Sequence, residues 1–180
     1  MIDRPSLFRL GMRRLAAGVS VVTTLEDGVP RGFVATAVTS VCAEPTPCLL
    51  VCVNRSVSSH DALHRSGILC VNVLAEGDAT LAARFASSNN RERRFEGCAW
   101  EALMTGAPAL EGALASFDCE IKHEMPVHSH TVFIAEVKAV RLSENEVAPL
   151  IYVDGRYERL GAAAGYGAAG GDAGASAACR

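Results

Sequence analysis

Short runs rich in β-branched and other apolar residues recur about every dozen residues along this chain, and only short helical stretches separate them. The strongest runs are residues 19–25, 32–41, 48–54, 68–75, 115–123, 130–142 and 150–153. Strands at this spacing are typical of an antiparallel barrel, whereas parallel βαβ units need a longer helix between strands. Closing such a sheet also removes the exposed edges that many apolar strands would otherwise leave. The sequence therefore predicts a mainly β fold built on a closed barrel.

Three short helices are predicted between or beside these strands. Apolar residues at helical spacing predict one over residues 5–17, stopped by Gly18, and another over Asp78–Ser87. A third is expected from Ser58 to Gly67, where Ser58 and Asp61 fit a capping box at the helix start.

Length and charge limit the class of protein. At 180 residues the chain suits one domain, which we expect to cover residues 1–160. A formal net charge of −3 argues against nucleic-acid binding, because that needs a basic face. No apolar run is long enough to span a membrane. Seven cysteines, at least four of them in strand-like runs, favour free thiols and therefore a cytoplasmic protein.

Residues 161–180 differ in kind, because fifteen of these twenty residues are Gly or Ala. Such a segment buries too little apolar surface to offset its ordering entropy, so a mobile tail is expected. It contains a formal dinucleotide-binding pattern, Gly165-Tyr-Gly167-Ala-Ala-Gly170, without the strand and helix that the pattern needs around it. We interpret the pattern as a coincidence of composition and expect truncation after Leu160 to leave fold and turnover intact.

Two neighbouring segments have the chemistry of a ligand site. Residues 35–40, Ala-Thr-Ala-Val-Thr-Ser, are too polar for a core, and their short side chains would let a flat ligand approach the backbone. The loop over residues 54–60 supplies hydroxyls and Arg55 where a helix is predicted to begin. Hydroxyls and free N–H groups at such a place favour a phosphate. The alternative is an ordinary capped loop beside an ordinary strand, and spacing alone does not decide between them.

Other kinds of reaction centre lack the residues that they need. His60 and His64 are four residues apart on a predicted helix, but no carboxylate and cysteine set completes a metal site, so no bound metal is predicted. The chain has no P-loop, no Gly-x-Ser-x-Gly motif and no Cys-x-x-Cys pair. Hydrolase and thiol-redox activities are therefore not predicted.

Several further motifs follow one another in a characteristic order and spacing. They are Ala17-Gly-Val-Ser-Val-Val-Thr-Thr24, Gly32-Phe-Val-Ala-Thr-Ala-Val-Thr-Ser40, Pro45-x-Pro-Cys-Leu-Leu-Val-Cys52, Cys70-Val-Asn-Val-Leu74, Arg94-Phe95 with Trp100, Leu114-Ala-Ser-Phe-Asp-Cys-Glu120 and His130-Thr-Val-Phe-Ile-Ala-Glu-Val137. Together they resemble the short-chain flavin reductase family, which has the FMN-binding split-barrel fold. The likeness covers most of residues 6–160 and is similar to reductases that serve 4-hydroxyphenylacetate-type or styrene-type monooxygenases.

This resemblance implies a six-stranded Greek-key split barrel with short flanking helices, and a homodimer with flavin near the interface. It also implies an NAD(P)H:flavin oxidoreductase that transfers hydride from NADH, or from NADPH, to FMN or FAD. The reduced flavin would then pass to a flavin-dependent oxygenase. His130 matches a family histidine linked to nicotinamide binding. The positions that match flavin-binding residues of the family are Thr36, Ala37, Val38, Thr39, Ser40, Asn54, Ser56, Ser58, Phe85, Ala86 and Tyr157.

One departure from the family pattern concerns His130. Many relatives have Gly-Asp before this histidine, whereas this chain has His128-Ser129, which removes backbone freedom and a fixed charge. The nicotinamide contacts and the choice between NADH and NADPH therefore stay open, as does the alternative of a barrel histidine with a structural role. Two other functions also stay open: a flavin-binding protein without activity, and a flavoprotein that keeps its flavin and reduces another acceptor.

Overall fold

The computed structural model describes residues 2–89, 91–144 and 146–160. Its three α-helices in this part of the chain are α1 (Arg4–Met12), α2 (His60–Ser66) and α3 (Ala79–Ala86), with 3₁₀ turns at Glu76–Asp78 and Arg91–Arg93. The strands are β1 (Ala17–Gly18), β2 (Ser20–Glu26), β3 (Val29–Ala35), β4 (Val38–Cys42), β5 (Cys48–Asn54), β6 (Ile68–Val73), β7 (Trp100–Ala102), β8 (Pro108–Leu110), β9 (Ala115–Val127), β10 (His130–Leu142), β11 (Leu150–Val153) and β12 (Arg156–Arg159). The protein is therefore mainly β, as predicted.

Seven of these strands form one antiparallel sheet in the order β3-β2-β6-β9-β10-β5-β4. Its two edge strands, β3 and β4, are consecutive along the chain and are joined only by Thr36 and Ala37. The sheet must therefore curl until its edges meet at this corner. The Cys52 N–H donates to the Ala37 carbonyl at 3.0 Å, which extends the β4–β5 pairing up to the corner. Because β3 and β4 are two halves of one bent strand, the seven-stranded sheet has the six strand positions that the family resemblance implied.

The prediction that the barrel is closed is wrong at this corner. Among the described residues no ladder joins β3 to β4, because β3 pairs with β2 and β4 pairs with β5. A strand cannot pair with its own continuation after a corner, so the barrel stays split there. The single strand predicted over residues 32–41 is broken for the same reason, at Thr36 and Ala37.

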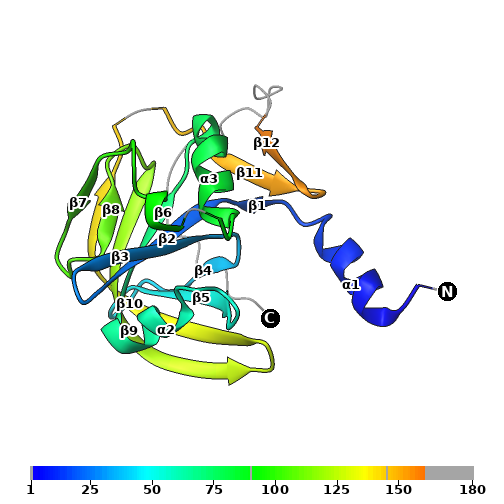
Figure 1. Ribbon diagram of the computed structural model, residues 1–180, viewed down its shortest axis with the longest axis horizontal. Coiled ribbons are helices and arrows are strands. Elements are labelled where there is room, and N and C mark those ends of the chain that lie inside the picture. The colour runs from blue at the N-terminus through cyan, green and yellow to red at the C-terminus, as the bar shows by residue number, and fades with distance from the viewer. Residues whose placement is uncertain (1, 90, 145, 161–180) are drawn as a thin grey trace.

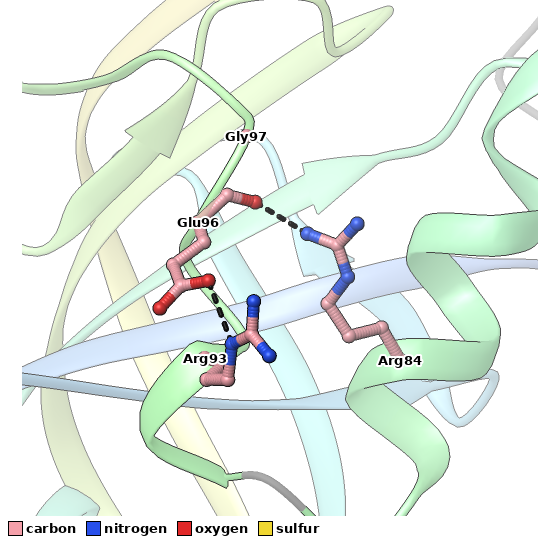
Figure 2. Close-up of a pocket in the computed structure, with 4 residues that line it drawn as sticks. All are labelled: Arg84, Arg93, Glu96 and Gly97. Carbon is pink, nitrogen blue, oxygen red and sulfur yellow. Dashed lines mark hydrogen bonds and ion pairs between the residues drawn. The ribbon is translucent and has the colours of Figure 1, made fainter.

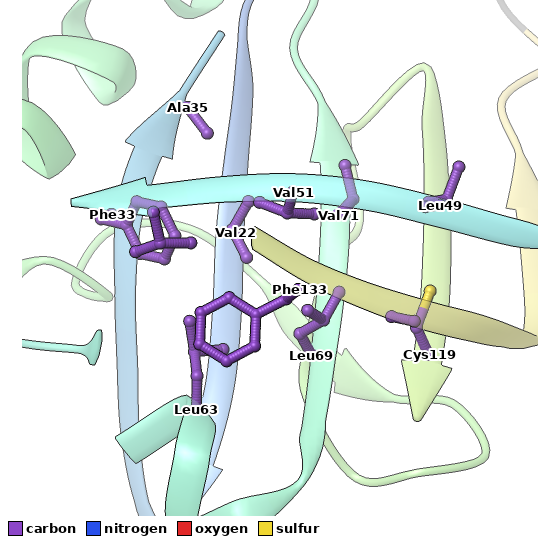
Figure 3. Packing of buried hydrophobic residues seen from close by; sticks show 12 residues of the cluster. Val22, Phe33, Ala35, Leu49, Val51, Leu63, Leu69, Val71, Cys119 and Phe133 are labelled. Atoms are coloured by element: carbon purple, nitrogen blue, oxygen red, sulfur yellow. The ribbon is translucent and has the colours of Figure 1, made fainter. Parts of the chain in front are cut away.

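The barrel interior contains the larger of the buried clusters. Along β5 the side chains of Leu49, Val51 and Val53 are buried and those between them are half-buried, which is the period of two that a strand imposes. Phe133 of β10 lies among residues from β2, β3, β5, β6 and α2 (Figure 3). A second cluster lies beneath α3 and contains Phe85, Leu81 and Leu150. The first cluster holds the strands of the barrel together, and the second packs α3 against the outside of the sheet.

Several predicted elements agree with the structure, and three differ. Strands 48–54, 130–142 and 150–153 have the predicted bounds, and strand 115–123 continues to Val127 because it pairs with β10 along a long hairpin. The first helix ends at Met12 rather than at residue 17, because Ala17 and Gly18 pair with β11. The capping box at the start of α2 is absent: Ser59 is the N-cap, and Asp61 contacts His60 instead.

Helix α1 projects away from the barrel (Figure 1), and none of its residues is buried. Three small strands, β1, β11 and β12, form a separate sheet at its base. The segment over residues 161–180, with its glycine pattern, lies outside the described residues. No helix in the described part of the chain is both long and apolar enough to cross a membrane.

Candidate functional site

A cavity of about 250 Å³ lies between the end of β3, the loop after β5 and the end of α3. Four residues selected from the sequence line it, namely Ser56, Ser58, Phe85 and Ala86. Arg91 and Arg94 line it as well, and with Ser58 they also line an adjoining cavity of about 290 Å³. We call the two together the serine–arginine cavity. The structure thus brings the predicted phosphate loop beside two arginines to which the sequence assigned no role.

The loop between β5 and α2 is held by its own side chains and by the next hairpin. The Asn54 carboxamide oxygen accepts hydrogen bonds from the backbone N–H and the hydroxyl of Ser56, both at 2.9 Å. The Arg55 N–H donates to the Ser129 carbonyl at 2.9 Å, and Asn54 lies opposite His130 in the β5–β10 pairing. Asn54 therefore shapes the loop, while the exposed Ser58 side chain faces the cavity.

Arg94 is the main electrostatic feature of this cavity. The residue is only 6% exposed, and its guanidinium donates to the Gly32 carbonyl at 2.7 Å and to the Ser87 carbonyl. Its Nε is buried without an acceptor, the one such side-chain atom among the described residues. Burial, followed by the nearby charge of Arg91, lowers the pKa of Arg94. The Arg94 guanidinium has only neutral carbonyl partners, and Arg91 forms no ion pair within the described residues. Two such neighbouring cations favour an anion between them.

Gly32 is the point at which β3, α2 and α3 come closest. A Cβ at this position would lie 2.8 Å from Cε1 of Phe85 and 3.0 Å from the Val22 carbonyl oxygen. The Gly32 carbonyl accepts from Arg94 and also from the Ser59 hydroxyl, at 3.2 Å. Phe85 itself is 1% exposed and packs edge-on against Phe95. Phe85 is therefore a core residue that also forms part of the cavity wall.

The predicted ring-binding segment lies next to this cavity, not inside it. Thr36 and Ala37, at the barrel corner, line a separate space of about 440 Å³ together with Tyr152 and residues of α1, which we call the corner cavity. Thr39 and Ser40 are exposed on β4, while Val38 is half-buried and packs against the barrel core. Val34 lines the first cavity and Thr36 lines the corner cavity, and these two residues are roughly 7 Å apart along the bent strand.

The two remaining predicted residues lie at the margins. Tyr157 is half-buried and packs against Tyr152 with ring centroids 5.6 Å apart, and burial raises its pKa. It thus supports a wall of the corner cavity. His130 begins β10, is half-buried, and its Nδ1 lies 2.9 Å from the Ser129 hydroxyl. The residues that line the cavities described above do not include His130 or Tyr157.

Histidines that could have suggested a metal have protein partners. Nε2 of His60 lies 2.8 Å from the Thr131 hydroxyl, and Nδ1 of His64 lies 2.7 Å from a Glu124 carboxylate oxygen. No group of three His, Cys, Asp or Glu residues that could hold a metal occurs within the described ranges. The site therefore has the donors of an anion site and lacks those of a metal centre.

A further cavity of about 390 Å³ is formed by the turn after α3 (Figure 2). There the Arg84 guanidinium donates to the Glu96 carbonyl, and Nε of Arg93 donates to the Glu96 carboxylate at 2.8 Å. These arginines are already bonded within the turn, in contrast to the unpartnered Nε of Arg94. Their role in the structure is to hold the segment that carries Phe95 and Trp100.

Comparison with known proteins decides the family. A model described as the flavin reductase like domain matches residues 12–161, most of the chain. The chain belongs to this flavin reductase family. It is 42% identical over 158 residues to "FMN reductase (NADH) RutF 2" of Rhizobium rhizogenes, covering 88% of this chain and 90% of that protein.

Two solved structures are similar to most of this chain. One is an NADH:FAD oxidoreductase from Streptomyces globisporus, SgcE6, in complex with NAD and FAD fragments; it has a TM-score of 0.82 and 28% identity, and the match covers 92% of this chain and 99% of that chain. The other is a homologue of nitrilotriacetate monooxygenase component B from Mycobacterium thermoresistibile, with a TM-score of 0.81, 29% identity and 86% coverage of both chains. The split-barrel fold implied by the sequence is confirmed.

Proposed function

We propose that this protein is an NADH-dependent flavin reductase that transfers hydride from NADH to FMN or FAD and releases the reduced flavin to a separate oxygenase. The observation that carries the proposal is the 42% identity to an NADH-dependent FMN reductase over nearly the whole of both chains. The similarity to a monooxygenase component supports an oxygenase as the recipient of the reduced flavin. A cytoplasmic location, which the many free thiols favour, belongs to the same proposal.

The serine–arginine cavity suits the phosphate end of the flavin. Ser56 and Ser58 supply hydroxyl donors, Arg91 supplies an exposed charge, and Arg94 adds a buried charge whose Nε has no acceptor. Charge-assisted hydrogen bonds of this kind are about twice as strong as neutral ones. In this assignment Asn54 and Ala86 shape the cavity and do not supply charge.

The bent strand suits the flat part of the flavin. Thr36 and Ala37 form the corner, and Thr39 and Ser40 expose short side chains and backbone beyond it. When bound, the flavin supplies the hydride-accepting chemistry; the protein orients the two rings and excludes water. Backbone N–H groups along residues 36–40 would stabilise negative charge on the reduced ring. Hydride transfer needs no acid–base pair of side chains, and the sequence motifs contain none.

We also propose that the protein works as a homodimer. Helix α1 buries none of its own residues, and its apolar side chains Leu7, Phe8 and Met12 are exposed. Apolar patches of this kind mark interaction surfaces. Phe8 and Met12 line the corner cavity with Thr36 and Ala37. A second copy packed against α1 would therefore complete the space beside the proposed ring-binding segment.

Anaerobic oxidation of NADH with excess FMN, FAD or riboflavin tests the catalytic proposal. We expect NADH consumption with each flavin and a higher KM for riboflavin, because riboflavin has no phosphate. A combined Ser58→Ala, Arg91→Gln variant should raise the KM for FMN about tenfold, which corresponds to about 1.4 kcal/mol, and leave that for riboflavin nearly unchanged. Arg93→Gln is the control, since Arg93 pairs with Glu96 outside this cavity.

Each alternative function gives a different result. A non-catalytic flavin protein would bind flavin without consuming NADH. A flavoprotein acting on another acceptor would keep its flavin through gel filtration and fail to turn over free FMN. Equal KM values for riboflavin and FMN would contradict the phosphate role of Ser56 and Ser58.

A further inference from the structure

Two cysteines face each other across the β4–β5 hairpin. Cys42, the last residue of β4, is the register partner of Cys48, the first residue of β5. Both thiols donate to the same acceptor, the Thr46 carbonyl, at 3.4 Å from Sγ of Cys42 and 3.5 Å from Sγ of Cys48. Directly opposed residues of antiparallel strands have Cα atoms about 4.5–5.5 Å apart, within the range of about 4.4–6.8 Å that a disulfide spans. The register shifts between Ser40 and Cys42, so the pair lies at a β-bulge. The shared Thr46 acceptor, rather than regular strand spacing alone, keeps the two sulfurs close enough for a bridge.

The surroundings of the pair distinguish it from the other cysteines. Cys42 is exposed and Cys48 is half-buried, so a small oxidant can reach the pair from Cys42. Cys52 lies four residues from Cys48 on the same strand, roughly 13 Å away along it. Cys70 and Cys119 are fully buried. Burial, and then the neighbouring Cys42 thiol, raises the pKa of Cys48. Cys42 is the more exposed of the two, so it is the thiol that reacts first with an oxidant.

We propose that Cys42 and Cys48 form a redox-active dithiol that hydrogen peroxide converts into a disulfide across the β4–β5 hairpin. The Cys42 sulfur, as thiolate, attacks one peroxide oxygen, the O–O bond breaks, and Cys42 sulfenic acid and water result. The Cys48 sulfur, as thiolate, then attacks the Cys42 sulfur and expels hydroxide, which takes up a proton to give a second water. In total two thiols lose two electrons and two protons to one peroxide, and a thiol reductant reverses the change.

A peroxide source follows from the proposed function, and this part of the inference rests on it. Reduced flavin that is released in air and not captured by an oxygenase reduces dioxygen to hydrogen peroxide. Cys42 lies two residues beyond Ser40 on β4, the strand that we assign to the flavin ring, and Cys48 lies opposite it on β5. The protein's own turnover would thus supply the oxidant to the solution around the dithiol. Transient disulfides of this kind are those expected in a reducing compartment.

Mass spectrometry of the full chain tests the site directly. After treatment with a small excess of hydrogen peroxide we expect loss of two hydrogen atoms, a cross-linked peptide pair that contains Cys42 and Cys48, and full reversal by dithiothreitol. Cys42→Ser should abolish the loss, and Cys42 is exposed, so this variant should fold. Cys52→Ser is the matched control on the same strand and should form the bridge normally.

Three results would overturn the proposal. They are a cross-link from Cys42 or Cys48 to any other cysteine, sulfinic or sulfonic acid at Cys42 with Cys48 still reduced, and the same mass loss in Cys42→Ser.

A second arm of the experiment replaces added peroxide by NADH and FMN in air, with and without catalase. We expect the same bridge, blocked by catalase. If only this arm fails while NADH is consumed, the dithiol stands on the first arm and turnover as the peroxide source is contradicted. If NADH is not consumed either, the proposed reductase activity is contradicted.

Discussion

At the scale of single residues, Arg94 links the proposed binding site to the fold. Its guanidinium bonds the backbone of β3 at Gly32 and the end of α3 at Ser87, while its charge remains without an anionic partner inside the serine–arginine cavity. A buried cation is costly when nothing compensates it. The same side chain therefore stabilises the packing of α3 and offers its uncompensated charge to a phosphate.

Arg94→Gln tests both roles of that side chain. We expect a loss of about 2 kcal/mol in the free energy of unfolding, because hydrogen bonds from a charged donor are removed. The dissociation constant for FMN should rise as well, measured by quenching of flavin fluorescence. Arg93→Gln is the control: its ion pair with Glu96 is exposed, so the change in stability should stay below about 0.5 kcal/mol. Unchanged FMN affinity in Arg94→Gln would limit Arg94 to a structural role.

His130 is the residue that the family resemblance links to nicotinamide binding. It lies opposite Asn54 at the start of β10, beside the phosphate loop, and it does not line the cavities described above. For His130→Ala we expect a severalfold higher KM for NADH with FMN affinity near that of the wild type. His123→Ala, at an exposed position of β9, is the control. A wild-type KM in His130→Ala would leave a barrel histidine as the correct interpretation.

At the scale of elements, the contact between β3 and α3 depends on the missing side chain at Gly32. The aromatic ring of Phe85 occupies the space that a Cβ would need, and Phe85 anchors α3 over the second core cluster. Residue 32 also contributes the carbonyl that receives both Arg94 and Ser59. One backbone position therefore sets how closely the helix approaches the strand.

Gly32→Ala should destabilise the protein by about 1–3 kcal/mol, since an added methyl group is forced into a packed contact. The Val22 carbonyl, 3.0 Å from the new Cβ, is backbone and cannot move aside cheaply. Gly112→Ala is the control, because its Cβ would meet nothing within 4 Å. Urea unfolding measures both variants, and a neutral Gly32→Ala would show that α3 can shift without cost.

The central strands β6 and β9 carry buried thiols that couple stability to alkaline pH. Burial, with the nearby charge of Asp118, raises the pKa of Cys119 to about 12 from its usual 9.0. The folded pKa is therefore above the unfolded one, so the neutral thiol contributes stability below pH 9. Above that pH the unfolded chain ionises first, and stability falls by about 1.4 kcal/mol per pH unit and thiol until the folded pKa is reached.

Urea unfolding between pH 8 and pH 11, with a reductant present, measures this effect. Wild type should lose stability more steeply than Cys119→Val, because the variant has one titrating thiol fewer. The difference between the two curves isolates Cys119 from the other groups that titrate in this range. Parallel curves would mean that the buried thiol ionises as readily in the folded protein as in the unfolded chain.

At the scale of the whole molecule, the split barrel leaves one part without a partner. The barrel and α3 bury their apolar faces within the chain, whereas α1 projects from it with Phe8 67% exposed (Figure 1). The corner cavity lies between this helix and the bent strand. A partner packed against α1 would therefore also cover the space beside the proposed ring-binding segment, so dimer formation and flavin binding are expected to depend on the same helix.

Phe8→Glu should dissociate the proposed dimer and lower flavin turnover, because it places a charge in the centre of the apolar helix face. Sedimentation velocity measures the first effect, and anaerobic NADH oxidation measures the second. Arg14→Glu changes charge just beyond the helix without removing apolar surface and should stay dimeric. A monomeric wild type, or a dimeric Phe8→Glu, would reject the role of α1.

The sequence alone determined most strands of the main sheet, because enrichment in β-branched and apolar residues is a local property. The short strands β1, β7, β8 and β12 were not predicted. Strands 48–54 and 130–142 were predicted to the residue, and the motifs between residues 17 and 137 were sufficient to indicate the family. The loop proposed to bind phosphate could also be selected, since its serines precede a helix. These features depend on neighbours along the chain.

Only the tertiary structure decided which segments meet. The sheet edges come together at Thr36 and Ala37, so that the barrel stays split, and folding places Arg91 and Arg94 beside Ser58. Strand register likewise places Cys42 opposite Cys48, and no Cys-x-x-Cys motif in the sequence predicts this pairing. Such contacts join residues far apart in sequence or depend on register across strands. These contacts form only when the whole chain packs, and a local sequence pattern does not specify how distant segments pack.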